Sequence, residues 1–478
     1  MTAAIAAVAG AIVAVRYHRL GLTLSHYDAR GHLAVARRVV DNITPGWQQV
    51  GAVWLPLPHL LNALPVQIDA FYRTGASAVA ISIASFAITT GVIAAIVGGI
   101  TRSTPAALAG ALVFALNPNV LYLQATPLTE PLLMALLTVA AAMLALAPVG
   151  HIRTAAVLFA LACLTRYEAW PVAAAAFPVC AWARWRRGQP LHQAAADVAV
   201  LGFATGTAIL GFAIFSRVVV GRWFVGSGFF VPENKALGDG LMAVKEIGWG
   251  LAGVGGTALV WIAAAGLAGL AVIALSDRRC ADALVVLTLP ATAAVPWAAF
   301  YQGHPFRVRY VVPLVVAEAI GCGIAAGLVR RASIAPAVLV ITVALFTLRP
   351  LDATAPFVVE AQWDRPNVPV RAGVTACLGP PRPGEKIMAS MGSLGHYMQD
   401  ASRAGYRIRD FLHEGNGDIW LAAIERPRPF AEWILIEEEA GGGDMLAAIA
   451  RKRPGFLDGY SRVCEGAGLA LYKREGGR

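Results

Sequence analysis

The chain is short of charge. Only 14% of its 478 residues are Asp, Glu, Lys or Arg, whereas 57% are hydrophobic. Soluble domains carry about a quarter charged residues, so this chain cannot coat a soluble globule with solvated side chains. Cysteine is also scarce: there are six, and none form a CxxC pair. This spacing excludes a typical zinc site or a dense disulfide framework, although Cys377 and Cys464 could pair if the C-terminal part faces an oxidising space.

The sequence is rich in long apolar segments. A helix needs about 20 apolar residues to cross roughly 30 Å of hydrocarbon, and about eleven runs approach that length. The first runs from Thr2 toward Leu24. The others lie near residues 76–100, 105–122, 127–147, 154–165, 169–182, 194–217, 249–275, 283–300, 310–328 and 333–348. Residues 1–348 are therefore predicted to form an α-helical polytopic membrane domain, with a helical hairpin over 154–182.

The basic residues indicate how this domain is oriented. The net charge of +10 does not predict nucleic-acid binding, because the cations lie in short connections between apolar runs, as in membrane proteins that keep positive loops in the cytoplasm. These connections hold Arg102, His151, Arg153, Arg184, Arg186, Arg187, Arg278, Arg279, Arg330 and Arg331. The alternate connections hold nearly all the carboxylates of the membrane domain. We therefore expect the mixed acid and base chemistry on the extracytoplasmic side.

Residues 349–478 are more polar than the rest of the chain. Strand-like runs at Lys386–Met391, Trp433–Glu437 and Leu469–Lys473 alternate with a helix-like run at Met445–Lys452. Such alternation predicts a small α/β domain. An odd number of spans places this domain on the outer face.

A polar motif follows the first apolar run. Asp28 lies between His26 and His32, and the apolar positions up to Asp41 predict a helix lying along the membrane surface. Asp28 there can act as a general base or simply cap the helix. His59, further along the first loop, is either a ligand or proton carrier or a hydrogen-bonded histidine of the membrane interface.

Glu130 lies near the start of the apolar run that begins at Pro127. A carboxylate within the hydrocarbon costs about 2.5–3.5 kcal/mol, a cost that the dipole at a helix N-terminus reduces. Glu130 is therefore either a helix cap or a second acid facing the same cavity as Asp28.

Several cations share the outer connections. Arg166 can pair with Glu168 or bind a phosphate, for which the guanidinium fork is suited. Arg307 and Arg309, with His304 and Tyr310, precede a late span and suit either a lipid phosphate or ordinary anchoring to headgroups. Lys235, in the 218–247 loop, adds another positive group.

Together these motifs resemble the GT-C membrane glycosyltransferases, especially their bacterial family-39-like and aminoarabinose-transferase-like branch. The resemblance rests on Tyr27–Asp28, Leu128–Leu132, Leu164–Glu168, Arg309–Pro313 and the polar C-terminal domain. It implies a polyprenyl-phosphate-linked sugar donor, an acceptor that is a lipid, glycan or protein, and inverting transfer on the outer face of the bacterial cytoplasmic membrane.

The resemblance also implies residue roles. Asp28 becomes the general base and Glu130 the second acid, which orients acceptor or sugar. Candidates for the donor phosphate are Arg166, Arg307, Arg309 and Lys235, and further candidates for the cavity are His26, His59, Glu168, His304 and Tyr310.

One departure from the family matters. Many relatives have an Asp-Glu pair in the first loop, whereas Ala29 follows Asp28 here. The role of a second acid therefore stays open, as does a divalent metal that Asp28 and Glu130 would bind. A transporter or flippase is the alternative function, because polar residues at membrane depth also line substrate pathways. Charges gathered at one face, and not at the midplane, favour the enzyme.

Overall fold

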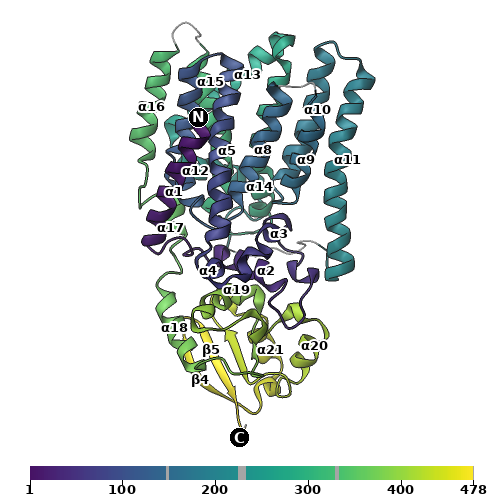
Figure 1. The fold of residues 1–478 in the computed structure, drawn as a ribbon, viewed down its shortest axis with the longest axis vertical. Helices are drawn as coiled ribbons and strands as arrows, with labels where there is room; N and C mark the ends of the chain where they lie inside the picture. The colour runs from purple at the N-terminus through teal and green to yellow at the C-terminus, as the bar shows by residue number, and fades with distance from the viewer. Residues whose placement is uncertain (147–149, 224–232, 329–332, 477–478) are drawn as a thin grey trace.

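The computed structural model describes residues 1–146, 150–223, 233–328 and 333–476. A bundle of apolar helices occupies one end of the molecule, and a small domain with a β-sheet caps the other (Figure 1). The bundle contains α1 (Thr2–Arg19), α5 (Ala76–Thr101), α6 (Thr104–Ala115), α7 (Pro118–Leu123), α8 (Glu130–Leu146), α9 (Ile152–Cys163), α10 (Ala169–Arg186), α11 (Leu191–Phe215), η3 (Ser216–Val220), α12 (Gly240–Gly255), α13 (Thr257–Ser276), η4 (Arg278–Ala293), α14 (Ala294–Tyr301), η5 (Val308–Leu314), α15 (Val315–Gly327) and α16 (Ile334–Leu348).

Among the described residues, five helical stretches are long and apolar enough to cross a membrane, namely Ala76–Thr101, Leu191–Val220, Thr257–Ser276, Arg278–Tyr301 and Val308–Gly327. Shorter apolar helices run beside them. The predicted hairpin is confirmed, because α9 ends at Cys163 and α10 begins at Ala169. The total of about eleven spans stays a prediction.

The span predicted over 249–275 is wrong in its detail. The chain breaks at Gly256, whose φ is +85°, so that α12 and α13 are separate helices. A Cβ on Gly256 would lie 2.1 Å from Cγ2 of Thr347, so the break needs glycine both for its backbone angle and for the close contact.

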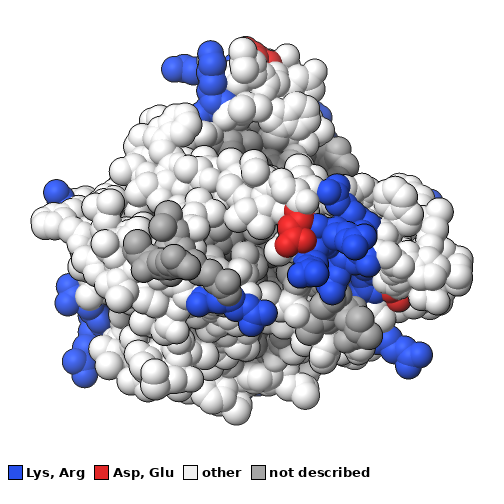
Figure 2. Space-filling view, turned by 90° about the horizontal axis from the view of Figure 1, so that it is seen from above, with Lys and Arg blue, Asp and Glu red and all other residues white. Residues whose placement is uncertain are grey.

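The end of the bundle away from the sheet is basic. Figure 2 looks onto this end and shows Lys and Arg side chains at several places, with little Asp or Glu. Two carboxylates that do lie in this part of the chain, Asp197 and Asp282, form ion pairs with Arg184 and Arg187. The predicted basic positions 330 and 331 lie outside the described residues.

At the opposite end, the first loop folds into α2 (Tyr27–Arg38), η1 (Trp47–Val50), α3 (Leu57–Ala63), η2 (Pro65–Gln67) and α4 (Asp69–Thr74). Helix α2 lies between the end of the bundle and the C-terminal domain, which covers it. Leu33 of α2 shares an apolar cluster with Leu394 and Tyr397 of α19 (Met391–Ala401). An apolar stripe has the same pattern whether lipid or protein covers it, which is why the sequence alone did not distinguish them.

The C-terminal domain is the predicted α/β unit. Its sheet has the order β2-β1-β3-β5-β4, with β1 parallel to β2 and β3, and β5 antiparallel to β3 and β4. The strands are β1 (Ile387–Met388), β2 (Phe411–Leu412), β3 (Trp433–Glu437), β4 (Tyr460–Gly466) and β5 (Leu469–Arg474), and the other helices are α18 (Asn367–Leu378), α20 (Asp418–Glu425) and α21 (Met445–Lys452). A disulfide between Cys377 and Cys464 joins α18 to β4.

The linker into this domain belongs structurally to the bundle. Within it, α17 (Pro356–Glu360) places Phe357 and Val358 in the apolar core of the bundle. The backbone N–H of Phe357 donates to Oδ1 of Asn119 at 2.9 Å. This attachment fixes α17 beside η5, where the charged groups of the first loop also gather.

Candidate functional site

Asp28 lies in the first turn of α2 and is 7% exposed. The helix cap is His26, whose Nδ1 accepts the backbone N–H of Asp28 at 3.1 Å. The Asp28 carboxylate is therefore not the N-cap. It forms an ion pair with Arg309, which comes from the distant segment η5.

Arg309 is 5% exposed, and its guanidinium lies over the ring of Tyr310, 5.0 Å from the ring centroid. Its Nη1 has no hydrogen-bond partner among the described residues. The charge of Arg309 also acts on Glu130 and Tyr27. A buried guanidinium nitrogen with an unused donor suits an anionic ligand.

Glu130, at the start of α8, is completely buried. Its Oε1 lies 3.0 Å from Nη1 of Arg166, but neither of its oxygens has an aligned hydrogen-bond donor among the described residues. Arg166 instead bonds Oε1 of Glu168 through Nε at 3.0 Å and Nη2 at 2.6 Å. One arginine is thus shared by two carboxylates, and Glu130 is left with unused acceptor capacity.

The structure brings four of the predicted residues into one group, which we call the acid–arginine cluster: Asp28, Glu130, Arg166 and Arg309. Glu168 joins it through Arg166. Counted with Glu168, the cluster has three carboxylates and two guanidinium groups, for a formal charge of −1. A cluster so close to neutral can exist in a buried position because its charges compensate one another.

Other predicted residues lie at the edge of the cluster. Arg307 is half-buried, and its charge acts on His26 and Tyr27. His304 packs edge-on against Tyr310, with 5.4 Å between the ring centroids, and burial is the main cause that lowers the pKa of His304.

Lys235 is not brought to the cluster. It is exposed, and its charge acts on Glu246. Residues 224–232 of the same predicted loop lie outside the described residues. His59 is buried and hydrogen-bonded to His32 and to the carbonyl of Leu55. Its contacts are therefore those of the predicted hydrogen-bonded histidine.

The sequence reasoning missed Glu360 and His32 as members of the site. Glu360 accepts the N–H of Val308 through Oε2 at 2.7 Å, which fixes the start of η5 and so positions Arg309. His32 lies one turn after Asp28 on α2, and the i, i+4 spacing of these two residues was an available sign that they share a face. Glu360 had no such sign, because its role depends on how the linker packs.

The residues present do not fit a resident divalent metal. Asp28 and Glu130 each face a guanidinium group. The described part of the chain contains no group of three or more His, Cys, Asp or Glu residues that could hold a metal ion. The chemistry available to the cluster is proton transfer by carboxylates and binding of an anion by arginines.

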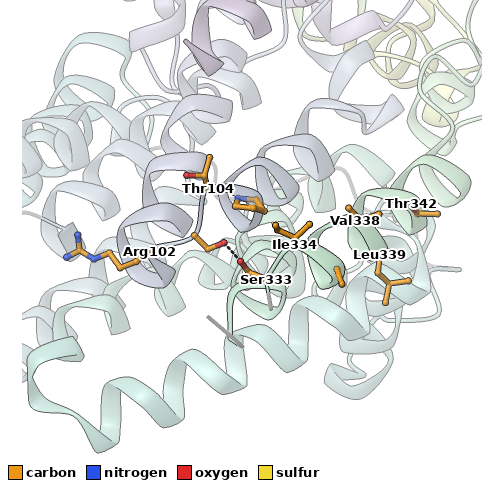
Figure 3. Close-up of a pocket in the computed structure, with 10 residues that line it drawn as sticks. Arg102, Thr104, Ser333, Ile334, Val338, Leu339 and Thr342 are labelled. Carbon is orange, nitrogen blue, oxygen red and sulfur yellow. Dashed lines mark hydrogen bonds between the residues drawn. The ribbon is translucent and has the colours of Figure 1, made fainter. Parts of the chain in front are cut away.

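One cavity lies elsewhere in the structure. It has a volume of about 850 Å³ and is lined by residues from the α5–α6 turn and from α16, including Arg102, Thr104 and Ser333 (Figure 3). These residues belong to the basic end of the bundle, away from α2. The cavity is therefore not part of the candidate site.

Two solved structures share the fold of this chain. ArnT from Cupriavidus metallidurans bound to undecaprenyl phosphate matches with a TM-score of 0.59 and 13% identity, over 97% of each chain. The apo state of the same protein matches with a TM-score of 0.57, at the same identity and coverage. Comparison with protein-family models and with curated sequences gives no match. The predicted GT-C-like membrane fold, with a small C-terminal sheet domain, is thereby confirmed.

Proposed function

We propose that this integral membrane protein is a glycosyltransferase that moves a sugar from a polyprenyl-phosphate-linked donor to an acceptor on the extracytoplasmic face. The observation that carries the proposal is the buried Asp28–Arg309 pair beside Glu130 and Arg166. The shared fold supports the donor class, because the matching ArnT structure is bound to undecaprenyl phosphate.

The Asp28–Arg309 pair gives a way to couple donor binding to base activation. In the free protein, the guanidinium of Arg309 occupies the Asp28 carboxylate. A donor phosphate binds the unused Nη1 of Arg309 and competes with Asp28 for the rest of the guanidinium. Asp28 is then released to accept a proton only when donor is present.

The transfer is a single displacement. An acceptor oxygen or nitrogen attacks the anomeric carbon, and the bond from that carbon to the phosphate oxygen breaks. The bonding electrons leave with the lipid phosphate, whose growing charge Arg309 and Arg166 stabilise. The acceptor proton passes to Asp28, and the configuration at the anomeric carbon inverts. Glu130, with its free acceptor capacity, orients the acceptor or the sugar.

Two features support an outward-facing site. The basic end of the bundle is opposite the C-terminal domain (Figures 1 and 2), and positive ends face the cytoplasm. The Cys377–Cys464 disulfide lies in the C-terminal domain, which packs on α2, and disulfides persist in oxidising spaces outside the cytoplasm. The bacterial cytoplasmic membrane fits both features.

The test is a transfer assay with purified protein and polyprenyl-phosphate sugars, followed by the release of polyprenyl phosphate. We expect Asp28→Asn to lower kcat by roughly 10²–10⁴, the usual contribution of a general base. Asp197→Asn is the matched control, since Asp197 also pairs with an arginine but at the basic end. Unchanged transfer by Asp28→Asn would refute the base assignment. Flipping of the lipid without transfer would refute the enzyme and favour a flippase.

A further inference from the structure

A pair of buried histidines lies beside the acid–arginine cluster. His32 belongs to α2, one turn after Asp28, and His59 belongs to α3. Their side chains are packed around Trp54, whose ring centroid is 4.1 Å from that of His32 and 5.8 Å from that of His59. His32 is 6% exposed and His59 is 1% exposed. Neither ring is free to reorient toward water.

The hydrogen bonds of this pair fix which nitrogens carry protons. The carbonyl oxygen of Leu55, 3.1 Å from Nδ1 of His59, can only accept, so His59 Nδ1 is the protonated nitrogen. His59 Nε2 then has a lone pair, and it lies 3.0 Å from Nδ1 of His32. His32 Nδ1 must therefore donate, which leaves His32 Nε2 with a bare lone pair.

This assignment requires both imidazoles to be neutral. Burial lowers the pKa of His59 to about 4 and is the main cause that lowers the pKa of His32 well below its usual value of 6.5. Both rings are therefore uncharged at neutral pH.

The bare nitrogen belongs to a ring that lies within reach of the cluster's charges. His32 Nε2 is buried and has no hydrogen-bond partner among the described residues. The charged side chains that act on the ring include Arg309 and Arg166, the two guanidinium groups of the cluster. A buried acceptor without a donor is costly in a folded protein and calls for an explanation such as a ligand.

The chemistry of the lone pair restricts that ligand. It repels the oxygens of an ionised phosphate and accepts only from an O–H or N–H group. The arginines provide for the phosphate, so the matching group is a hydroxyl on the sugar attached to it. We infer that His32 Nε2 accepts a hydrogen bond from a hydroxyl of the donor sugar, and that His59 and the Leu55 carbonyl hold His32 in the accepting tautomer. The inference rests on the proposed function for the identity of the ligand.

A binding experiment tests the contact of His32 with the sugar. The probes are undecaprenyl phosphate itself and undecaprenyl phosphates that carry glucose, mannose, arabinose or xylose. His32→Phe keeps a ring against Trp54 but removes the lone pair. We expect about a tenfold loss of affinity for the sugar-bearing lipid that wild type binds best, as for one lost hydrogen bond, and unchanged affinity for undecaprenyl phosphate. Equal losses for both lipids, no loss for either, or a wild type that does not favour any sugar-bearing lipid would each overturn the inference.

A second experiment tests the positioning role of His59. His59→Gln offers a carbonyl oxygen to His32 Nδ1, whereas His59→Phe offers nothing and lets His32 adopt the other tautomer. We expect His59→Phe to lose affinity for the sugar-bearing lipid as His32→Phe does, while His59→Gln stays near wild type. Nitrogen-15 NMR of the imidazoles should show protonated Nδ1 on His32 in wild type and in His59→Gln, and protonated Nε2 in His59→Phe.

The two readouts separate this inference from the proposed function. Protonated Nε2 on His32 in wild type, or equal affinities in the two His59 variants, would overturn the inference even if sugar transfer occurs. Failure of sugar transfer would overturn the proposed function, while binding and tautomer still report on His32.

Discussion

Charged groups lie on two sides of helix α2, and the two sides differ in how completely their carboxylates are hydrogen-bonded. Toward the C-terminal domain, Arg30 bonds Asp364 at 2.8 Å and also pairs with Asp400. Both oxygens of Asp364 are bonded as well by Arg371, at 2.8 and 2.5 Å. Toward the bundle, Arg309 and His32 have unused polar atoms, and Glu130 has no aligned donor among the described residues. The difference between the two sides lies in their carboxylates. A carboxylate bonded through both oxygens, as in Asp364, specifies how two parts of a protein pack, whereas a buried carboxylate without an aligned donor, as in Glu130, calls for an explanation such as a ligand.

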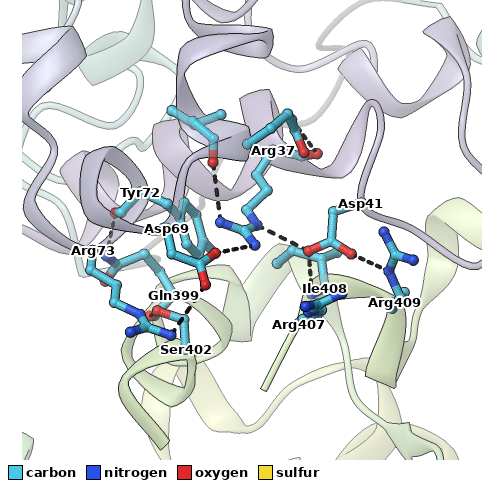
Figure 4. Close-up of polar contacts among 12 residues, drawn as sticks. Arg37, Asp41, Asp69, Tyr72, Arg73, Gln399, Ser402, Arg407, Ile408 and Arg409 are labelled. Carbon is cyan, nitrogen blue, oxygen red and sulfur yellow. Dashed lines mark hydrogen bonds and ion pairs between the residues drawn. The ribbon is translucent and has the colours of Figure 1, made fainter. Parts of the chain in front are cut away.

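A second ion-pair group reinforces the surface toward the C-terminal domain (Figure 4). Arg37 bonds Asp41 at 2.9 Å and Asp69 at 2.6 Å, and its guanidinium lies 4.5 Å from the centroid of the Tyr72 ring. Asp41 in turn accepts from Arg409 of the C-terminal domain at 2.6 Å. The side of α2 toward the C-terminal domain is therefore a docking surface, whereas the side toward the bundle carries the residue that we propose as the base, Asp28.

The largest expected effect after that of Asp28→Asn tests the surface toward the bundle. Arg309→Gln should lower kcat for sugar transfer by roughly 10²–10³, because a preorganised donor to the leaving phosphate is lost. The double variant Asp28→Asn with Arg309→Gln separates function from folding. Removing both partners of a buried pair avoids an uncompensated charge, so thermal stability should recover relative to Arg309→Gln while transfer stays lost. Recovery of transfer in the double variant would make the pair purely structural.

The next prediction concerns the surface toward the C-terminal domain. Asp364→Asn leaves Arg30 and Arg371 without their shared carboxylate, and breaking a buried pair typically costs about 3–5 kcal/mol in the free energy of unfolding. We expect a lower Tm in detergent, with kcat at 25 °C unchanged for the protein that remains folded. A loss of kcat at full stability would show that the docking surface takes part in chemistry and would end the contrast between the two sides.

The sequence predicted the helices of the bundle better than it predicted the difference between the two sides of α2. Length and hydropathy located the helices, and the side with mixed charge correctly grouped Asp28 with Arg309, which lie far apart in the chain. The break at Gly256 had a sign in the Gly255–Gly256 pair that was not used. The burial of α2 under the C-terminal domain had none, because an apolar stripe does not specify what covers it.

The sequence also could not predict which buried polar groups have hydrogen-bond partners and which do not. Whether a carboxylate is saturated, as in Asp364, or open, as in Glu130, depends on the geometry of neighbours from other segments. The tautomer of His32 depends on one carbonyl, that of Leu55, at the end of a chain of two hydrogen bonds. The direction in which the Leu55 carbonyl points is set by the fold and not by the type of residue.

The smallest expected effect is the pH dependence of the docking surface. Burial acts to raise the pKa of Asp41, but hydrogen bonds from Arg409 and Arg37 outweigh it and hold the pKa below its ordinary value of 3.8. A carboxylate with a lowered folded-state pKa contributes stability above its unfolded pKa and loses it as pH falls through the folded value. Wild type should therefore be more stable than Asp41→Asn by roughly 1–2 kcal/mol at pH 7, as for hydrogen bonds to a charged group.

That difference should shrink as the pH falls below about 4, where Asp41 of the unfolded chain begins to take up a proton while Asp41 of the folded protein stays ionised. Thermal unfolding of both proteins between pH 3 and pH 7 measures it. Asp418→Asn, at an exposed carboxylate of the C-terminal domain with no ion pair among the described residues, is the control and should follow wild type. A constant difference across this range would mean that Asp41 contributes through packing and not through its charge. The ion pairs of Asp41 with Arg37 and Arg409 would then contribute little to the stability of the docking surface.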